Sequence, residues 1–177
     1  MLIALTLNGQ KLSLCNVYAP NDQVNQLQFM QELNNCIIDK SELTSLIVAG
    51  DWNCTLSKKD KFGGEQWKPS SYRNLIMTTM EMFDLVDIQR IRHPKLRKFT
   101  NESKSLKLKS RVDFFLTAKT LSGVAKNSEI YHAIAPDRTN LLGDQDSGNL
   151  TTPYRMICSM LVRFVIHTLT RAVIIAM

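Results

Sequence analysis

An aspartate and an asparagine, Asp51 and Asn53, stand two residues apart directly after an apolar run. The run over residues 46–49, followed by Gly50, predicts a strand that is buried on both faces. Because side chains alternate along a strand, Asp51 and Asn53 are expected to emerge on the same side at its end. A carboxylate and a carboxamide held together in this way can orient a water molecule and hold a phosphate oxygen. The simpler alternative is a strand followed by an asparagine-containing turn.

Asp113 is a second carboxylate that could take part in chemistry, because it interrupts an apolar pattern. Residues 111–116, with the sequence Arg-Val-Asp-Phe-Phe-Leu, predict a strand that carries this acid. A buried carboxylate is costly unless it is paired or hydrogen-bonded, so Asp113 needs a partner. Such a residue is either structural or part of a site, and we favour a site.

A hairpin, a helix and a strand are expected to position Asp51. Residues 2–7 and 11–18 predict a β-hairpin, because the Asn-Gly pair at 8–9 suits a type I′ turn. Apolar residues at helical spacing predict a helix over residues 24–39. The buried strand that ends at Asp51 follows this helix. The alternation of strands with a helix predicts an α/β fold.

The elements after Asn53 are expected to be shorter and more polar. Residues 58–69 predict a polar loop that contains glycine, after which a second helix begins at Ser70 or Ser71. The apolar face of that helix is expected to extend to Phe83. Residues 130–142 predict a short strand, a loop and the start of another strand.

The positive charge of the chain is concentrated in one stretch. Residues 90–111 hold nine of the 22 basic residues and a single acid, Glu102, in a chain whose net charge is +6. Such a run is typically a solvated, partly disordered loop. The alternative is a surface for a polyanion, because clustered cations gain affinity by releasing counterions from nucleic acid. Phe99 is the one aromatic residue in the run, so the sequence does not indicate a base-stacking platform.

The last part of the chain differs in composition from the rest. Residues 143–155 predict a polar linker, and residues 156–177 are strongly apolar with Arg163, His167 and Arg171 on one face of a predicted helix. A transmembrane span is disfavoured because each mid-membrane arginine would cost roughly 2.5–3.5 kcal/mol. We expect an amphipathic helix that binds a membrane surface or a protein partner. A translated non-homologous exon or reading frame is a third alternative.

The cysteines predict a reducing environment. Cys15, Cys36, Cys54 and Cys158 show neither close pairing nor the spacing of a metal site. Without a signal peptide they indicate buried thiols in an intracellular compartment, and they disfavour a structural zinc site.

Four short motifs follow one another in a specific order. They are Asn16-Val17-Tyr18-Ala19-Pro20-Asn21, Gly50-Asp51-Trp52-Asn53, Ser110-Arg111-Val112-Asp113-Phe114 and Pro136-Asp137. At the ends of predicted strands they resemble the endonuclease/exonuclease/phosphatase superfamily, and in particular the apurinic-type endonuclease domain of non-LTR retrotransposons. Residues 85–100 resemble the same subgroup. The resemblance covers residues 1–142 and implies an incomplete two-sheet α/β sandwich that hydrolyses DNA phosphodiesters with Mg²⁺.

The resemblance implies a catalytic role for four matching residues and a phosphate contact for a fifth, Asn21. Asp51 would activate and orient the attacking water, and Asn53 would steady that water or a phosphate oxygen. Tyr18 and Asn21 would contact the phosphate or the leaving group. Asp113 would orient the histidine that follows the last acid in the family.

The resemblance also implies a metal site and contacts to DNA. Asp137 would be a carboxylate ligand of Mg²⁺, for which Mn²⁺ could substitute. Thr100 and Ser110 would lie near the DNA backbone. Arg97 and Lys98, from the basic stretch, would add phosphate contacts.

Two departures from the family pattern predict impaired chemistry. Arg138 stands where the family has its histidine; arginine binds phosphate but does not exchange protons near neutral pH. We expect Arg138 to pair with Asp113 or Asp137. Met1 falls inside the family's fold, so the metal-binding glutamate of the family's N-terminal strands has no counterpart and the metal site is expected to be incomplete.

The sequence therefore predicts a Mg²⁺-dependent DNA endonuclease domain whose activity is impaired or absent. We expect it to be intracellular, and nuclear if the family role is retained. One alternative is a non-catalytic remnant that binds nucleic acid through the basic stretch. Another is a protein docked on a membrane or partner through residues 156–177.

Overall fold

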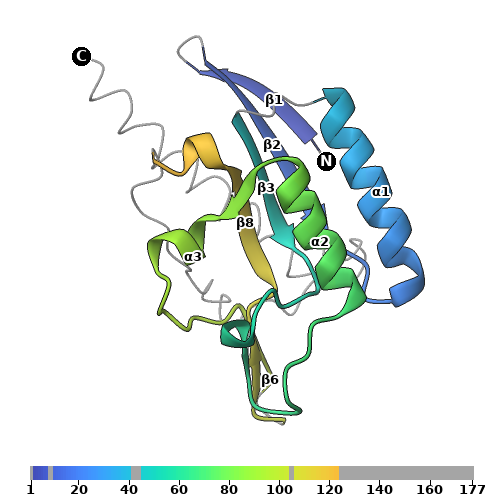
Figure 1. Cartoon of the computed structure of the whole chain (residues 1–177), viewed down its shortest axis with the longest axis vertical. Helices are drawn as coiled ribbons and strands as arrows, with labels where there is room; N and C mark the ends of the chain where they lie inside the picture. The colour runs from blue at the N-terminus through green and yellow to red at the C-terminus, as the bar shows by residue number, and fades with distance from the viewer. Residues whose placement is uncertain (1, 8–9, 41–44, 104–105, 124–177) are drawn as a thin grey trace, which may run out of the picture.

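The computed structural model describes residues 2–7, 10–40, 45–103 and 106–123 (Figure 1). Its strands and helices, in chain order, are β1 (Leu2–Leu7), β2 (Gln10–Tyr18), α1 (Gln23–Lys40), β3 (Leu46–Asp51), β4 (Lys61–Phe62), α2 (Ser71–Met82), β5 (Leu85–Asp87), α3 (Ile88–Arg92), β6 (Asn101–Ser103), β7 (Leu108–Ser110) and β8 (Asp113–Ala118). Two 3₁₀ turns, η2 (Lys58–Asp60) and η3 (Lys119–Leu121), complete the described elements.

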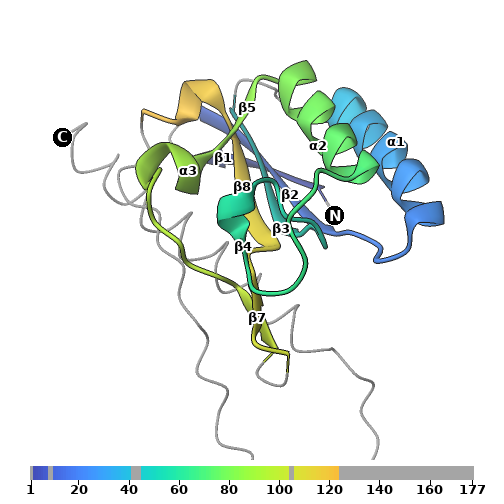
Figure 2. The ribbon, with the colours of Figure 1, turned by 60° about the horizontal axis from the view of Figure 1, so that its bottom comes forward.

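The strands form two sheets of different size. The larger sheet has five strands in the order β1-β2-β3-β8-β5, and the smaller has three in the order β4-β7-β6. Strands β2 and β3 are parallel and are connected through α1, whereas β8 runs antiparallel to both of its neighbours. The small sheet projects beyond the end of the large one (Figures 1 and 2). The α/β class with two sheets agrees with the sequence prediction.

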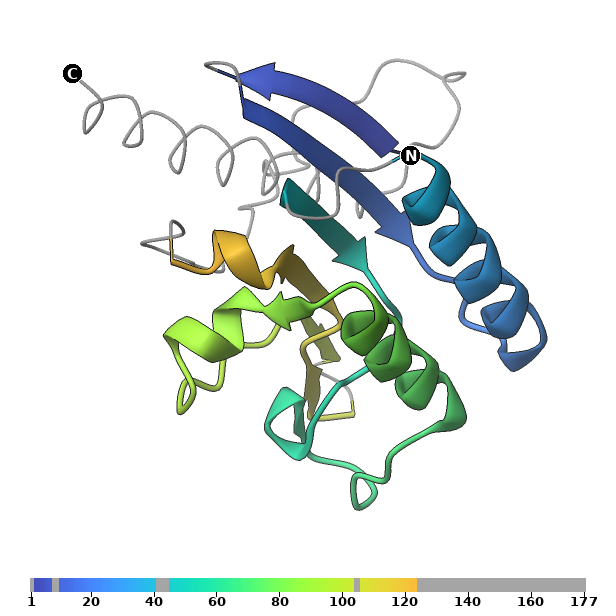
Figure 3. The ribbon, with the colours of Figure 1, turned by 45° about the horizontal axis from the view of Figure 1, so that its top comes forward.

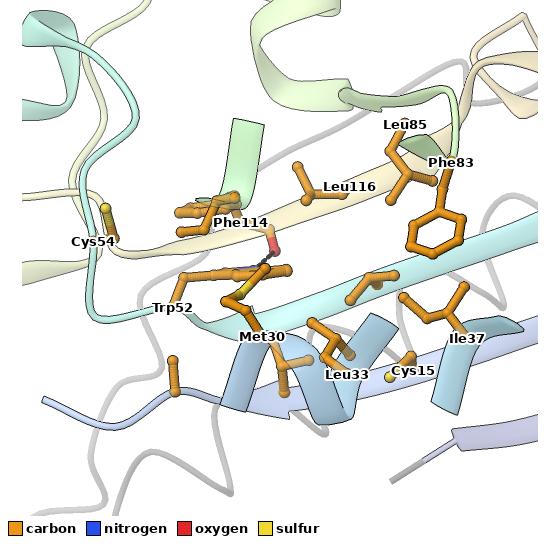
Figure 4. Packing of buried hydrophobic residues seen from close by; sticks show 14 of the residues in the cluster. Cys15, Met30, Leu33, Ile37, Trp52, Cys54, Phe83, Leu85, Phe114 and Leu116 are labelled. Atoms are coloured by element: carbon orange, nitrogen blue, oxygen red, sulfur yellow. Dashed lines mark hydrogen bonds between the residues drawn. The ribbon is translucent and has the colours of Figure 1, made fainter. Parts of the chain in front are cut away.

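Helices α1 and α2 lie side by side on one face of the large sheet (Figures 2 and 3). A hydrogen bond from Thr79 Oγ1 to Asn34 Oδ1, 3.0 Å long, joins them. The main core lies between these helices and the sheet, where the Trp52 and Phe114 rings stack with centroids 5.2 Å apart (Figure 4). The Trp52 indole N–H donates to the Phe114 carbonyl oxygen at 3.3 Å, so this large side chain is buried without losing its polar contact.

The predicted elements of the first half are confirmed. The hairpin pairs Leu2 with Cys15 through to Leu7 with Gln10, and α1 and β3 occupy the expected ranges. Helix α2 begins after Ser70, whose Oγ accepts a hydrogen bond from the Arg73 N–H at 3.1 Å. A serine at this position satisfies one of the amide groups that the first helical turn leaves unpaired.

Residues 85–110 contain more regular structure than expected from the basic stretch at 90–111, which is typical of a solvated loop. This region contains β5, α3, β6 and β7, each of them only three to five residues long. Elements this short carry too few residues for an apolar period to be visible, and pairing with partners that are distant in sequence stabilises them. The predicted strand at 130–142, the linker at 143–155 and the tail helix at 156–177 lie outside the described residues.

Three cysteines in the described segments are free thiols, as expected. Cys15 and Cys54 are buried and Cys36 is partly exposed, whereas Cys158 lies outside these segments. Burial raises the pKa of Cys15 to about 11, because the thiolate would lose its hydration. Among the helices that the structure describes, none is both long and apolar enough to cross a bilayer.

Candidate active site

Three predicted site residues lie in a row across neighbouring strands. Tyr18 is paired with Asp51 between β2 and β3, and Asp51 is paired with Asp113 between β3 and β8. Side chains of directly paired residues point to the same face of a sheet. That face is opposite to α1 and α2, because the alternate residues Trp52 and Phe114 point into the core beneath the helices. The fold thus brings together two carboxylates and a phenol from motifs that are distant in sequence.

Asn53 is fixed next to Asp51 by a tight turn. Its backbone N–H donates to Asp51 Oδ1 at 2.8 Å, and its side-chain Nδ2 donates to the Ala19 carbonyl oxygen at 2.5 Å. The φ angle of Asn53 is 46°, in the left-handed region that asparagine tolerates better than most residues. The carboxylate and the carboxamide are therefore held in place before any substrate arrives.

Gly50 allows β3 to approach β2 closely at the point where the site begins. Its φ is +148°, and a Cβ built at this position would lie 1.9 Å from the Val17 carbonyl oxygen. No side chain fits such a space. The glycine therefore sets the position from which Asp51 emerges.

The two carboxylates lie in an environment that disfavours their charge. Asp113 is 7% exposed, and burial raises its pKa to about 6, with the neighbouring Asp51 charge adding to the rise. A hydrogen bond from the Thr100 side chain opposes this shift. Burial also raises the pKa of Asp51, against the hydrogen bond from the Asn53 N–H. Perturbed carboxylates of this kind are typical of functional sites, where the fold keeps them at a cost in stability.

We expect Asp113→Asn to stabilise the fold near neutral pH but not near pH 4. Well below pH 3.8 the carboxyl is protonated in both the folded and the unfolded chain, and at pH 4 the difference in stability is still small. As the pH rises, the unfolded carboxyl loses its proton near 3.8 and the folded one near 6, so the native chain loses stability across this window. About two pKa units correspond to about 3 kcal/mol. Thermal unfolding at pH 7 should show a melting temperature roughly 6–12 °C higher for the variant.

The control for this experiment is Asp39→Asn, at the exposed C-terminal end of α1. It should change the melting temperature equally little at both pH values. A gain for Asp113→Asn that is as large at pH 4 as at pH 7 would show that its carboxylate is not the source of the effect.

The structure brings one further predicted residue, Thr100, into the site. Its Oγ1 accepts the backbone N–H groups of Val112 and Asp113, at 3.1 and 3.2 Å. Its own N–H donates to the Ser110 carbonyl oxygen at 2.9 Å. Thr100 and Ser110 therefore fix the start of β8, from which the Asp113 side chain emerges.

The remaining predicted residues are at the periphery or outside the described segments. Asn21 is exposed after β2, and Arg97 and Lys98 are exposed in the connection between α3 and β6. Asp137 and Arg138 lie beyond the described residues, so the predicted pairing of Arg138 with an acid is not tested.

A buried ion-pair network beside the site was not predicted from the sequence. Arg111 is 1% exposed, and its Nε donates to Asp60 Oδ1 at 2.7 Å while its Nη2 donates to Asp87 Oδ2 at 2.5 Å. Arg90 also pairs with Asp60. Burial by itself would raise the pKa of Asp60, but its hydrogen bonds and charge contacts with these arginines hold that pKa below its ordinary value.

The network corrects the interpretation of the basic stretch as a solvated loop. Arg111 and Arg90 point inward, and Arg92 donates to the Ser122 carbonyl oxygen at 2.5 Å. Arginines in this stretch therefore hold α3, η2 and the start of β8 together. Asp60 and Asp87 are visible in the sequence as acids, but their spacing does not indicate that either pairs with Arg111.

The oxygen atoms of Asp51 and Asp113 are ligands of the kind that a hard divalent cation prefers. Asp51 and Asp113 offer carboxylate oxygens on one face, and Mg²⁺ is typically held by one or two carboxylates together with waters and substrate phosphate. Within residues 2–7, 10–40, 45–103 and 106–123, no group of three or more histidine, cysteine or acidic side chains could hold a metal ion. The described residues thus fit one side of such a site.

Comparison with solved structures identifies the fold. An AP endonuclease from Archaeoglobus fulgidus matches with a TM-score of 0.57 and 22% identity, over 69% of this chain and 54% of that one. The endonuclease domain of TRAS1, a telomere-specific non-LTR retrotransposon, matches with a TM-score of 0.52 and 12% identity, over 70% and 52% of the two chains. The chain therefore has the fold of the endonuclease/exonuclease/phosphatase nucleases, in agreement with its motifs.

A sequence relative comes from a mobile element. The chain is 32% identical over 95 residues to the Xenopus laevis protein described as "Transposon TX1 uncharacterized 149 kDa protein". That alignment covers 52% of this chain and 7% of the transposon protein. No family model matches the chain. The chain spans about half the length of the two solved nucleases described above. The chain is thus similar in fold to a retrotransposon endonuclease domain and similar in sequence to a transposon protein.

Proposed function

We propose that the chain is a DNA endonuclease domain of the retrotransposon type, which hydrolyses phosphodiesters with a divalent metal ion and does so slowly. The observation that carries this proposal is the row formed by Tyr18, Asp51 and Asp113, with Asn53 fixed against Asp51. The nuclease fold and the transposon relative support it.

Asp51 is the residue that we assign to the attacking water. Its carboxylate ends a buried strand, and its raised pKa brings it closer to the pH at which a general base is efficient. We assign Asn53 to steadying the same water or a phosphate oxygen, and its hydrogen bonds to Asp51 and to the Ala19 carbonyl oxygen support this assignment by fixing the residue beside Asp51. Tyr18, which is 45% exposed on the adjacent strand, is accessible to the substrate phosphate.

Asp137 would be the carboxylate ligand of the metal ion, whereas Asp51 would serve the attacking water. A bound Mg²⁺ or Mn²⁺ would supply neutralisation of the charge that develops on the phosphate. We assign slow turnover because Arg138 replaces the histidine expected after Asp137. Arginine can bind the phosphate, but it cannot pass a proton to or from it near neutral pH.

The test is nicking of supercoiled plasmid by the full chain in Mg²⁺, with EDTA as the blank. We expect weak, metal-dependent conversion to open circles. Arg138→His should raise the rate by about tenfold or more, because an imidazole at this place could exchange protons. Nicking that persists in EDTA would contradict metal-dependent hydrolysis, and an unchanged rate in Arg138→His would contradict the role given to this position.

A second candidate is a non-catalytic domain that binds nucleic acid. Arg138 in place of histidine favours it, as do the exposed cations at Lys95, Arg97 and Lys98. In that case neither the native chain nor Arg138→His would nick plasmid, but both would retain DNA in a salt-sensitive manner. Docking on a membrane or protein through residues 156–177 remains a proposal about a segment outside the described residues.

A further inference from the structure

Two phenylalanines that are distant in sequence form a ring pair at the small sheet, and the Phe62 ring is exposed. The ring centroids of Phe62, in β4, and Phe99, just before β6, lie 6.4 Å apart with a tilt of 49°. Phe62 is 53% exposed and Phe99 is partly buried. The Arg97 guanidinium lies 5.9 Å from each centroid, and its Nη2 donates to the Lys61 carbonyl oxygen at 2.8 Å. We call Phe62, Phe99 and Arg97 the aromatic patch.

The surroundings of the aromatic patch are cationic. Phe62 is paired with Lys109 between β4 and β7, so both side chains point to the same face of the small sheet. Lys109 is 39% exposed and is bridged to Glu102 at 2.8 Å. Lys95 and Lys98 flank Arg97 in the chain and are exposed. Exposed lysines of the basic stretch therefore flank Arg97, which lies over both rings, whereas Arg90 and Arg111 belong to the buried ion-pair network.

The aromatic patch is connected to the candidate active site through a single residue. Phe99 precedes Thr100, whose Oγ1 accepts the N–H groups of Val112 and Asp113. The small sheet that carries the patch projects beyond the Asp113 end of β8 (Figure 2). A strand of nucleic acid that reached the site could thus continue onto the patch.

We propose that the aromatic patch is a stacking platform for unpaired bases of a single-stranded segment of nucleic acid next to the candidate active site. Bases stack on aromatic side chains and on arginine whatever their sequence, whereas paired bases are already stacked in the duplex. The neighbouring lysines contact the phosphates. This inference rests on the proposed function for its biological setting. It differs from the sequence prediction, which considered only the basic stretch and so did not include Phe62. The structure places Phe62 in β4, within residues 58–69 that the sequence predicted as a polar loop.

The experiment measures fluorescence anisotropy of labelled oligothymidine, about 12 nucleotides long, which is within the range of single-strand binding sites. The full chain is used in EDTA, so that cleavage does not interfere. Phe62→Ala should weaken binding about tenfold, whereas binding of a duplex of the same length should change less than twofold. Phe62→Trp should retain or increase the affinity, because a larger ring stacks at least as well.

Salt dependence separates stacking from phosphate contact. Lys98→Ala should lower the slope of log affinity against log salt by about one, and Phe62→Ala should leave that slope unchanged. Val24→Ala, which removes an 87% exposed apolar side chain from α1, is the matched control and should bind as the native chain does. A parallel series with oligouridine distinguishes DNA from RNA as the source of the strand.

Three results would overturn the platform. One is unchanged single-strand affinity in Phe62→Ala; another is equal weakening for duplex and single strand; the third is weak binding by Phe62→Trp while its melting temperature is native. The two proposals can fail independently. If the chain nicks no plasmid but its single-strand binding depends on Phe62, the platform is supported and the catalytic proposal is contradicted.

Discussion

Asp51→Asn is expected to abolish plasmid nicking without destabilising the fold. Removing a positioned general base typically costs about 10²–10⁴ in rate, which would bring a slow enzyme to the level of the EDTA blank. The amide can still accept the hydrogen bond that the Asn53 N–H donates at 2.8 Å. Because burial raises the pKa of Asp51, a neutral side chain should fit its environment at least as well at neutral pH. Plasmid nicking and thermal unfolding measure the two effects.

The combination of lost activity and retained stability is what separates a catalytic role from a structural one. Asp39→Asn provides the matched control, because it makes the same change at an exposed position on α1 and should alter neither property. If Asp51→Asn nicks plasmid at the native rate, Asp51 does not act on the water. If it unfolds at a markedly lower temperature, the Asp51 carboxylate is a structural group and the site assignment fails.

Arg111→Met is expected to cause the largest loss of stability in the chain. It would leave Asp60 and Asp87 buried without the guanidinium that pairs with both of them. Removing one partner of a buried ion pair typically costs about 3–5 kcal/mol, a large part of the stability of a domain of this size. We expect the melting temperature to fall by roughly 10–15 °C. Lys95→Ala, which removes an exposed cation from the same basic stretch, should shift it by less than about 2 °C.

Neutralising the two acids should rescue this variant. The triple change Asp60→Asn, Asp87→Asn and Arg111→Met removes both carboxylate charges that lose Arg111, but it also takes the Asp60 charge away from Arg90. Part of the lost stability should therefore return. A melting temperature for the triple variant that is as low as that of Arg111→Met would mean that lost packing of the arginine side chain, including its contact 5.5 Å from the Phe114 ring centroid, dominates instead.

The local elements that present Asp51 could be predicted because their signals are local. An apolar run ending at Gly50 defines β3, an Asn-Gly pair defines the hairpin and a serine cap defines the start of α2. Each of these depends on side-chain alternation, turn geometry or capping within a few residues. The same signals identified Asp113 as an acid inside a strand.

The contacts between distant segments could not be predicted in this way. That Asp113 is paired with Asp51 depends on β8 being inserted between β3 and β5, a strand order that the spacing of the motifs leaves open. Residues 85–110 lacked a visible period because their elements are very short. Their structure depends on the buried ion pairs of Arg111 with Asp60 and Asp87, and a local sequence pattern does not show such pairs.

By itself the sequence determined the motifs, their order and the elements that carry them, and from these the nuclease fold and its candidate residues. Only the tertiary structure decided which charges are buried and which are exposed. It divided the basic stretch into buried arginines that hold the fold and cations that face solvent, and it placed Phe62 beside Phe99. The physical reason is that charge burial and aromatic contact depend on neighbours in space, and the sheet order supplies those neighbours.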